Sequence, residues 1–418
     1  MEHGIRLRLF FAIFAFLAVS SPSFKGAAAQ TAEHPRELHE IYDLAPGGVV
    51  SVDSAGGYIR VTSWDEDRVK VDAVKRGRRD EDAGQIEVQV TRRPDRIDIR
   101  TIHSRGPVDY DLKVPRGAVL DSLTTTSGEI TVYDNVASVT ASSRSGPITV
   151  REVSGDATLS STGGAIAAGR VGGSLVVTTT AGKLEIGEVV RALNARCASC
   201  NIIARGLGGD ATVRTTSGSI ELERVGGRVN AQTMSGRIRI NDVGGDVIAK
   251  SYSDSITITN ARGFVTADAL SGDIIVRGAS AGARAVSVSG SIEISDSKGL
   301  IEANATNGQI ILNNIDGKDV SAKSANGRVL FTGEFYESGR YLFFSANGNV
   351  VLTLPPESNF NLTVKSDNGS INTEFPLKLE PGSQPGGREP IAGVVGKGGA
   401  EVRAISANGA VHIKKAAQ

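Results

Sequence analysis

Apolar and polar residues alternate over short stretches of the chain, and this pattern repeats every 18 residues in eleven units between Gly128 and Gly308. Each unit reads G-x-I-x-V-x-x-V-x-G-x-V-x-A-x-T-x-S. The alternation predicts two short strands per unit, each with one buried face. A period held without insertions predicts that every unit stacks on the last in the same way, which is typical of a solenoid.

Glycines mark two corners in each unit, nine residues apart, and Cys200 and Asp254 replace two of them. We interpret the glycines as positions where positive φ lets the chain reverse. Two opposite corners predict a flattened coil with two sheets. The first corner is formed by Gly128, Gly146, Gly164, Gly182, Gly218, Gly236, Gly272, Gly290 and Gly308. The second corner is formed by Gly155, Gly173, Gly209, Gly227, Gly245, Gly263, Gly299 and Gly317.

Two residues after the first corner, ten units carry Ile and the remaining one carries Leu184. We expect this column to be a continuous ladder in the interior of the solenoid. Because one coil buries too few side chains to fold alone, its stability has to come from hydrogen bonds and like-on-like side-chain contacts with its neighbours.

Beyond Gly308 the spacing loosens, although residues 124–418 as a whole are predicted to be solenoid. Asn-Gly pairs follow at 326–327, 347–348 and 368–369, with spacings of 19, 21 and 21, and a last pair comes 40 residues later at 408–409. Asn also accepts left-handed backbone geometry, so the corner is retained. Residues 376–400 are rich in Pro and Gly and predict an exposed loop before one final strand from Val402 to Lys414.

The N-terminal part of the chain has a different pattern. Residues 41–123 alternate like ordinary strands joined by charged turns, and we expect a β-rich cap that covers the open end of the solenoid. Residues 30–40 are expected to be a linker. Residues 1–29 predict a signal peptide, with Arg6 and Arg8, an apolar run from Leu9 to Val19 and small residues up to Ala29.

These features predict export to the periplasm, the cell surface or the medium. The apolar run is about half the length that a membrane span needs, and we expect no transmembrane segment after signal removal. Lys plus Arg equal Asp plus Glu at 46 each, so no basic excess favours nucleic acid as a partner. Aromatic residues make up 5% of the chain, which suits thin coils with small interior side chains.

The sequence resembles the bacterial putative-adhesin domain family of exported β-helix proteins. The segments that carry the resemblance are Gly57–Val71, Tyr110–Ala118, the Ser-Gly-x-Ile units, Leu354-Pro355, Phe375-Pro376 and Gly393–Gly399. The resemblance covers nearly all of the mature chain. It implies a right-handed parallel β-helix and an envelope location, and it brings no catalytic residues.

Cys197 and Cys200 are the two cysteines of the chain. By the repeat, Cys200 stands at a corner and Cys197 at an inward Thr position, so we expect a disulfide across this corner; two reduced packing thiols are the alternative. A redox role is not expected, because such motifs act at a helix N-terminus. A zinc site would need two further ligands, and no His lies near the pair in sequence or in repeat position.

The sequence predicts no catalytic, cofactor-binding or metal-binding residues. A calcium roll would need Asp at nearly every corner, whereas the residue after the second Gly is Asp156, Asp210 or Asp246 in some units and Ser174, Arg228 or Phe264 in others. We therefore expect a non-enzymatic, adhesin-like binding or scaffold protein of the bacterial envelope, whose partner is an envelope protein or a glycan. The alternative is a carbohydrate-active β-helix enzyme, either a polysaccharide lyase or a hydrolase.

Overall fold

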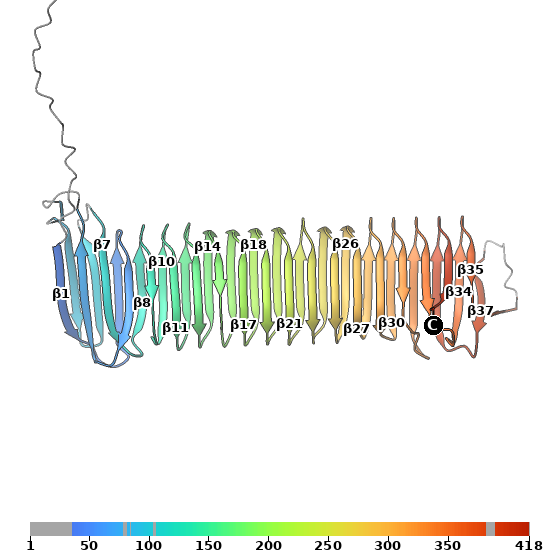
Figure 1. The fold of residues 1–418 in the computed structure, drawn as a ribbon, viewed down its shortest axis with the longest axis horizontal. Helices are drawn as coiled ribbons and strands as arrows, with labels where there is room; N and C mark the ends of the chain where they lie inside the picture. The colour runs from blue at the N-terminus through green and yellow to red at the C-terminus, as the bar shows by residue number, and fades with distance from the viewer. Residues whose placement is uncertain (1–35, 78–81, 84, 103–105, 382–388, 418) are drawn as a thin grey trace, which may run out of the picture.

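The protein is a long rod of stacked β-strands, from the N-terminal end drawn in blue to the C-terminal end drawn in red (Figure 1). The structure is a computed structural model that describes residues 36–77, 82–83, 85–102, 106–381 and 389–417. The predicted signal peptide lies outside these described residues. The solenoid prediction is confirmed, because parallel strands about 18 residues apart in sequence pair along almost the whole rod.

The strands form two sheets, which we call sheet A and sheet B. In stacking order, sheet A contains β1 (Arg36–Asp43), β4 (Arg68–Lys75), β7 (Val108–Pro115), β3 (Ile59–Trp64), β9 (Ile130–Val132), β11 (Ile148–Val153), β13 (Ile166–Val171), β15 (Leu184–Ile186), β17 (Ile202–Leu207), β19 (Ile220–Val225), β21 (Ile238–Val243), β23 (Ile256–Ala261), β25 (Ile274–Ala279), β27 (Ile292–Lys298), β29 (Ile310–Asp316), β31 (Val329–Thr332), β33 (Val350–Leu354), β39 (Val411–Lys415) and β35 (Ile371–Thr373). Sheet B contains β5 (Glu87–Arg93), β6 (Arg96–Ile102), β2 (Val49–Ser54), β8 (Val119–Thr125), β10 (Ser138–Ser143), β12 (Ala157–Ser161), β14 (Leu175–Ala181), β16 (Leu193–Ser199), β18 (Ala211–Ser217), β20 (Val229–Ser235), β22 (Val247–Ser251), β24 (Val265–Ser271), β26 (Gly282–Ser289), β28 (Leu300–Ala305), β30 (Asp319–Ser324), β32 (Arg340–Ser345), β38 (Ala400–Ser406), β34 (Phe360–Ser366), β37 (Ile391–Val395) and β36 (Leu377–Leu379).

The Ile column forms the predicted interior ladder of sheet A. Ile238, for example, pairs with Ile220 on one side and with Ile256 on the other. All eleven side chains of this column are at most 1% exposed. Inward positions of sheet B, such as Leu159 and Val213, face them and are fully buried as well. The expected interior ladder is therefore confirmed, and the core runs along the axis of the rod.

The corner glycines are required mainly because neighbouring corners lie very close together. A Cβ atom at Gly146 would overlap the carbonyl oxygen of Gly128 in the preceding coil, and the same holds along the column. Positive φ, which we expected to explain every corner, occurs at only some of them, for example at Gly218 with φ 143°. The sequence-based explanation was thus incomplete: the close approach of one backbone to the next excludes side chains at most corners.

Buried hydroxyl groups stabilise the same corners. Buried Ser and Thr residues at or near the ends of the sheet B strands point inward, and several of them donate hydrogen bonds to corner carbonyl oxygens. Ser143 Oγ donates to Gly128 O at 3.3 Å, and Ser324 Oγ donates to Gly308 O at 2.8 Å. These bonds satisfy polar groups that burial would otherwise leave unpaired.

Many of the coils also contain a third bend, which was not predicted from the repeat pattern. Residues with positive φ recur every 18 positions inside the sheet A strands of seven consecutive coils. They are Gly206, Arg224, Asp242, Asn260, Gly278, Asp296 and Asn314, and Asp134 repeats the geometry in an earlier coil. The ladder of paired residues is interrupted at this position. Arg205 pairs with Glu223 and Leu207 pairs with Val225, so Gly206 and Arg224 between them are left out of the register. Sheet A therefore bends along a line parallel to the rod axis.

At the N-terminal end, the order of the coils departs from the order of the sequence. Strands β2 and β3 form a coil that lies between β6 and β7 on one side and β8 and β9 on the other. Strands β1, β4 and β5 then pair antiparallel beyond β7 and β6 (Figure 1). Antiparallel strands end the parallel stack at this point.

The C-terminal end shows the same kind of rearrangement and corrects a prediction. The expected single strand from Val402 to Lys414 is wrong, because Asn408 and Gly409 form a corner between two strands, β38 and β39. These strands make a full coil between the coil β32–β33 and the coil β34–β35. The Pro- and Gly-rich segment at 376–400 contains β36 and β37, which pair antiparallel next to β34.

Candidate functional site

A groove follows the register column of the third bend along the outer side of the rod. Two cavities follow one another along the bend, with volumes of about 840 and 960 Å³. Arg205 lines the first cavity and the adjacent Gly206 lines the second, so we treat the two as one axial groove. Its lining includes one residue of this register column from each of nine consecutive coils: Asp134, Glu152, Arg170, Glu188, Gly206, Arg224, Asp242, Asn260 and Gly278.

Several residues with little or no side chain line the axial groove, and we call them its floor. Ala167, Ala168, Gly169 and Gly187 line the first cavity. Gly208, Gly226 and Gly244 line the second cavity. A Cβ atom at Gly187 would come within 2.6 Å of the Gly169 carbonyl oxygen, so the close approach of these two coils leaves no room for a side chain at this position.

Charged side chains of both signs line the groove. Arg170 pairs with Glu188 at 3.4 Å, and Arg205 pairs with Glu223 at 2.9 Å. These pairs are largely solvent-exposed, and exposed ion pairs contribute about 0 to 1 kcal/mol each. The arginines and carboxylates can therefore exchange their present partners for groups of a bound ligand at little cost.

The bend residues also contact one another from coil to coil. Asn260 Nδ2 donates to Asp242 Oδ1 at 2.9 Å, and Asn314 Nδ2 donates to Asp296 Oδ1 at 2.7 Å. Asn and Asp accept left-handed backbone geometry more readily than other non-glycine residues. The recurrence of Asp, Asn and Gly in this column from Asp242 to Asn314 was the sequence signal for the bend.

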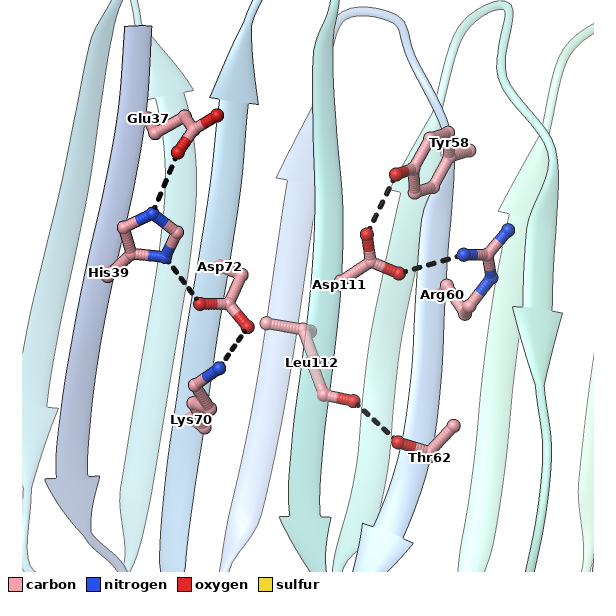
Figure 2. A network of polar contacts seen from close by, with 9 residues as sticks. All are labelled: Glu37, His39, Tyr58, Arg60, Thr62, Lys70, Asp72, Asp111 and Leu112. Atoms are coloured by element: carbon pink, nitrogen blue, oxygen red, sulfur yellow. Dashed lines mark hydrogen bonds and ion pairs between the residues drawn. The ribbon is translucent and has the colours of Figure 1, made fainter.

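A second polar cluster lies on the outer face of sheet A in the N-terminal cap (Figure 2). His39 on β1 contacts Glu37 of its own strand at 3.0 Å and Asp72 of β4 at 2.7 Å. Lys70 donates to the other oxygen of Asp72 at 2.7 Å. The hydrogen bonds to Asp72 and Glu37 raise the pKa of His39 above 6.5. Burial of Asp72 opposes its ionisation, but its bonds from His39 and Lys70 outweigh this and lower its pKa.

A neighbouring part of this face joins β3 to β7 (Figure 2). The Tyr58 hydroxyl donates to Asp111 Oδ2 at 2.7 Å, and Arg60 donates to the other oxygen at 3.1 Å. Burial, followed by the bond to Asp111, raises the pKa of Tyr58 to about 12. Asp72 and Asp111 each accept hydrogen bonds from side chains on their own or a neighbouring strand. The cluster therefore connects both antiparallel and parallel strands of the cap.

The two cysteines lie where the repeat places them. Cys197 on β16 stands in register with Thr179 and Thr215, and Cys200 occupies the following corner. The structure joins their sulfur atoms in a disulfide, with the Cα atoms 6.0 Å apart. Both residues are buried.

The corner aspartates have a structural contact that needs no metal ion. Oxygen Oδ1 of Asp156, Asp210 and Asp246 accepts the backbone N–H of the residue 18 positions later, at 2.7 to 2.8 Å. Across the described part of the chain, no group of three or more His, Cys, Asp or Glu side chains is placed to hold a metal ion. Nor does that part contain a helix that is long and apolar enough to cross a membrane.

The family assignment rests on two overlapping matches, over residues 49–299 and 244–414, which together cover most of the chain. The chain belongs to the Toastrack family, DUF4097. This match confirms the resemblance to the uncharacterised putative-adhesin family that the Ser-Gly-x-Ile units suggested. The Toastrack matches include the whole axial groove, the inserted C-terminal coil and the disulfide.

Solved structures were also found to be similar to this Toastrack protein. One is a putative cell adhesion protein from Clostridium sporogenes ATCC 15579, with 8% identity and a TM-score of 0.16, covering 92% of this chain and 100% of that one. Another is a putative adhesin from Bacteroides fragilis NCTC 9343, with 11% identity and a TM-score of 0.18, covering 68% and 97%. No curated protein matches the chain.

Proposed function

We propose that this Toastrack protein is an exported, non-enzymatic, adhesin-like binding or scaffold protein of the bacterial envelope, and that the axial groove binds its partner. The observation that carries the proposal is the length of the groove. It follows nine consecutive coils, and strands in a sheet are about 4.8 Å apart, so it extends over roughly 40 Å. A compact metabolite would fill only a small part of such a surface.

The shape and chemistry of the groove favour an extended polymer, either a glycan strand or an unfolded segment of an envelope protein. The bare floor lets a chain lie flat against the backbone, and the mixed charges offer hydrogen-bond donors and acceptors in every coil. Binding then sums many weak contacts, as expected for an adhesin-like surface.

The alternative is cleavage of a polysaccharide in the same groove. Glu152, Glu185 and Glu188 line the first cavity, and glycoside hydrolysis uses a pair of carboxylates. Glu188 is paired with Arg170, and Glu185 contacts Lys183. Both of these carboxylates therefore already contact a basic side chain, whereas the carboxylates of a glycosidase have to flank the scissile bond of the substrate.

The test is to fill the groove without disturbing the stack. Ala167→Trp places a large side chain over the floor from an outward position of β13, and Thr257→Trp makes the same change on β23 outside both cavities. Both variants and the wild-type protein would be screened on arrays of neutral, acidic and basic polysaccharides and of extended peptides. We expect A167W to weaken binding at least tenfold and T257W to leave it unchanged.

Equal binding by all three proteins would place the ligand outside the groove. The release of new reducing ends or unsaturated products from a bound polysaccharide would instead support the enzymatic alternative. Localisation is tested separately by N-terminal sequencing of the mature protein, which should begin near Gln30.

A further inference from the structure

The last coil of the chain occupies a position that its place in the sequence does not explain. The C-terminal coil, Ala400–Lys415, lies between the coil β32–β33 and the coil β34–β35, and both of these precede it in the sequence. We call the space between these two coils the slot. The chain therefore completes both walls of the slot before it provides the coil that fills it.

The C-terminal coil fits the slot through the same ladders that join all other coils. Val402, Ala404, Val411 and Ile413 are at most 1% exposed in the interior. Asn408 donates its side-chain amide to Asn347 at 2.7 Å and accepts one from Asn368 at 2.7 Å. With the bonds from Asn326 to Asn307 and from Asn347 to Asn326, this makes an unbroken Asn ladder.

The two walls of the slot require a coil with the general repeat pattern, and not one particular sequence. Leu342, Arg403 and Thr363 share one register position on three adjacent strands. The corner residues Asn347 and Asn368 are 21 residues apart, the same spacing as Asn326 and Asn347. Any coil with an inward apolar pattern and an Asn-Gly corner would satisfy both walls, and the C-terminal coil of a second copy satisfies them by identity.

A glycine-rich turn connects the C-terminal coil to β37. Gly396, Gly398 and Gly399 have φ values of 63°, 77° and 134°, in the region that favours glycine. Beyond this turn, β37 stays paired with β34 and β36 on the other side of the slot. Rotation within the turn would release β38 and β39 together without disturbing the antiparallel strands.

We propose that two copies of this protein exchange their C-terminal coils reciprocally, so that each slot is filled by the partner's coil. In the folded chain the C-terminal coil makes two interfaces, one with each wall of the slot. If the coil left the slot, the two walls could at best contact each other, so two interfaces would be replaced by one. Reciprocal exchange restores the hydrogen bonds and buried side chains between the C-terminal coil and both walls in each copy, which makes a second copy the favoured occupant. The exchange links two rods at their C-terminal ends and doubles the number of axial grooves in one assembly.

The test uses disulfides that can form only between copies. Leu342→Cys and Arg403→Cys are introduced into separate preparations, one of them isotope-labelled, at positions that are register partners across β32 and β38. The preparations are mixed, taken through the midpoint of unfolding in denaturant, diluted and oxidised. We expect a covalent dimer of about twice 43.5 kDa, with peptide mapping showing a link between labelled and unlabelled chains.

The matched control is the pair Thr212→Cys and Asn230→Cys, which are register partners in the middle of the stack, where no coil is inserted out of order. Mixing these two preparations should give no link between copies. The proposal is overturned if the mixed L342C and R403C preparations also give none, while the L342C/R403C double variant forms its link within one chain. A failure of the groove experiment would not affect this result, since the slot lies outside both cavities.

Discussion

At the residue scale, each repeat position has one physical task. Ile in the third position fills the interior, Gly in the first lets neighbouring backbones approach, and the hydroxyl that ends a sheet B strand satisfies the corner carbonyl. Because each task recurs in every coil, single substitutions test the arrangement directly.

Ile238→Asp should destabilise the protein by roughly 4 kcal/mol or more, since it buries a carboxylate between Ile220 and Ile256 with no partner. The control, Arg239→Asp, changes the next, exposed residue and should shift stability by about 0.5 kcal/mol or less. Denaturant unfolding followed by circular dichroism measures both. Wild-type stability of I238D would contradict the interior ladder.

The Cys197–Cys200 disulfide is testable by mass. Protein purified from an oxidising compartment should be lighter by two hydrogens than the same protein after reduction, because the two sulfur atoms are joined across the corner. Alkylation of either cysteine under native, non-reducing conditions would exclude the bridge.

His39 should titrate with a pKa above 6.5, because its protonated form is stabilised by hydrogen bonds to Asp72 and Glu37. The stabilisation is fully present below 6.5 and is lost as the pH rises through the raised pKa of the folded protein. Asp72→Asn should move the pKa back towards 6.5, whereas Glu302→Gln in the middle of the rod should not. An NMR titration of the ring that finds no difference between D72N and E302Q would refute this contact.

At the element scale, the coil is the unit of stability. Neighbouring coils present the same ladders to each other, as Ile202, Ile220 and Ile238 do in sheet A. Coils are inserted out of sequence order near both ends without loss of pairing, and we expect that a coil can also be removed from the middle of the rod.

Deletion of one whole unit, Gly218–Ser235, should leave a folded protein, because Ile202 can then stack on Ile238 in the same register. Deletion of only residues 218–226 should prevent folding, since half a coil brings a sheet B strand to a sheet A position. Far-UV circular dichroism and the cooperativity of thermal unfolding distinguish the two variants. Loss of structure in the whole-unit deletion would show that the coils are not interchangeable.

At the scale of the whole molecule, the stack of coils produces a long axial groove. The axial groove follows one register column through consecutive coils, and the positive-φ bend is repeated along its second cavity. Its chemistry is consequently spread over many residues.

Replacement of one groove carboxylate, Glu188→Gln, should weaken ligand binding by no more than about threefold, because each coil contributes a small part of the interface. An enzyme would respond differently, since loss of one catalytic carboxylate removes turnover. Polysaccharide cleavage that is abolished in E188Q while the fold stays intact would contradict the binding role.

The sequence by itself determined the period, the two sheets, the interior Ile column and the corner positions. Each of these depends on residues within one unit or between neighbouring units, so the repeat exposes them directly. The tertiary structure alone decided the bend of sheet A, the cluster of His39 with Asp72, and the insertion of the C-terminal coil. Pairings such as Asn347 with Asn408, or β1 with β4, join distant segments whose register no local pattern specifies. The local repeat determines how one coil is built. Which coils become neighbours is decided by the tertiary structure, because many coils present nearly equivalent strand edges to one another.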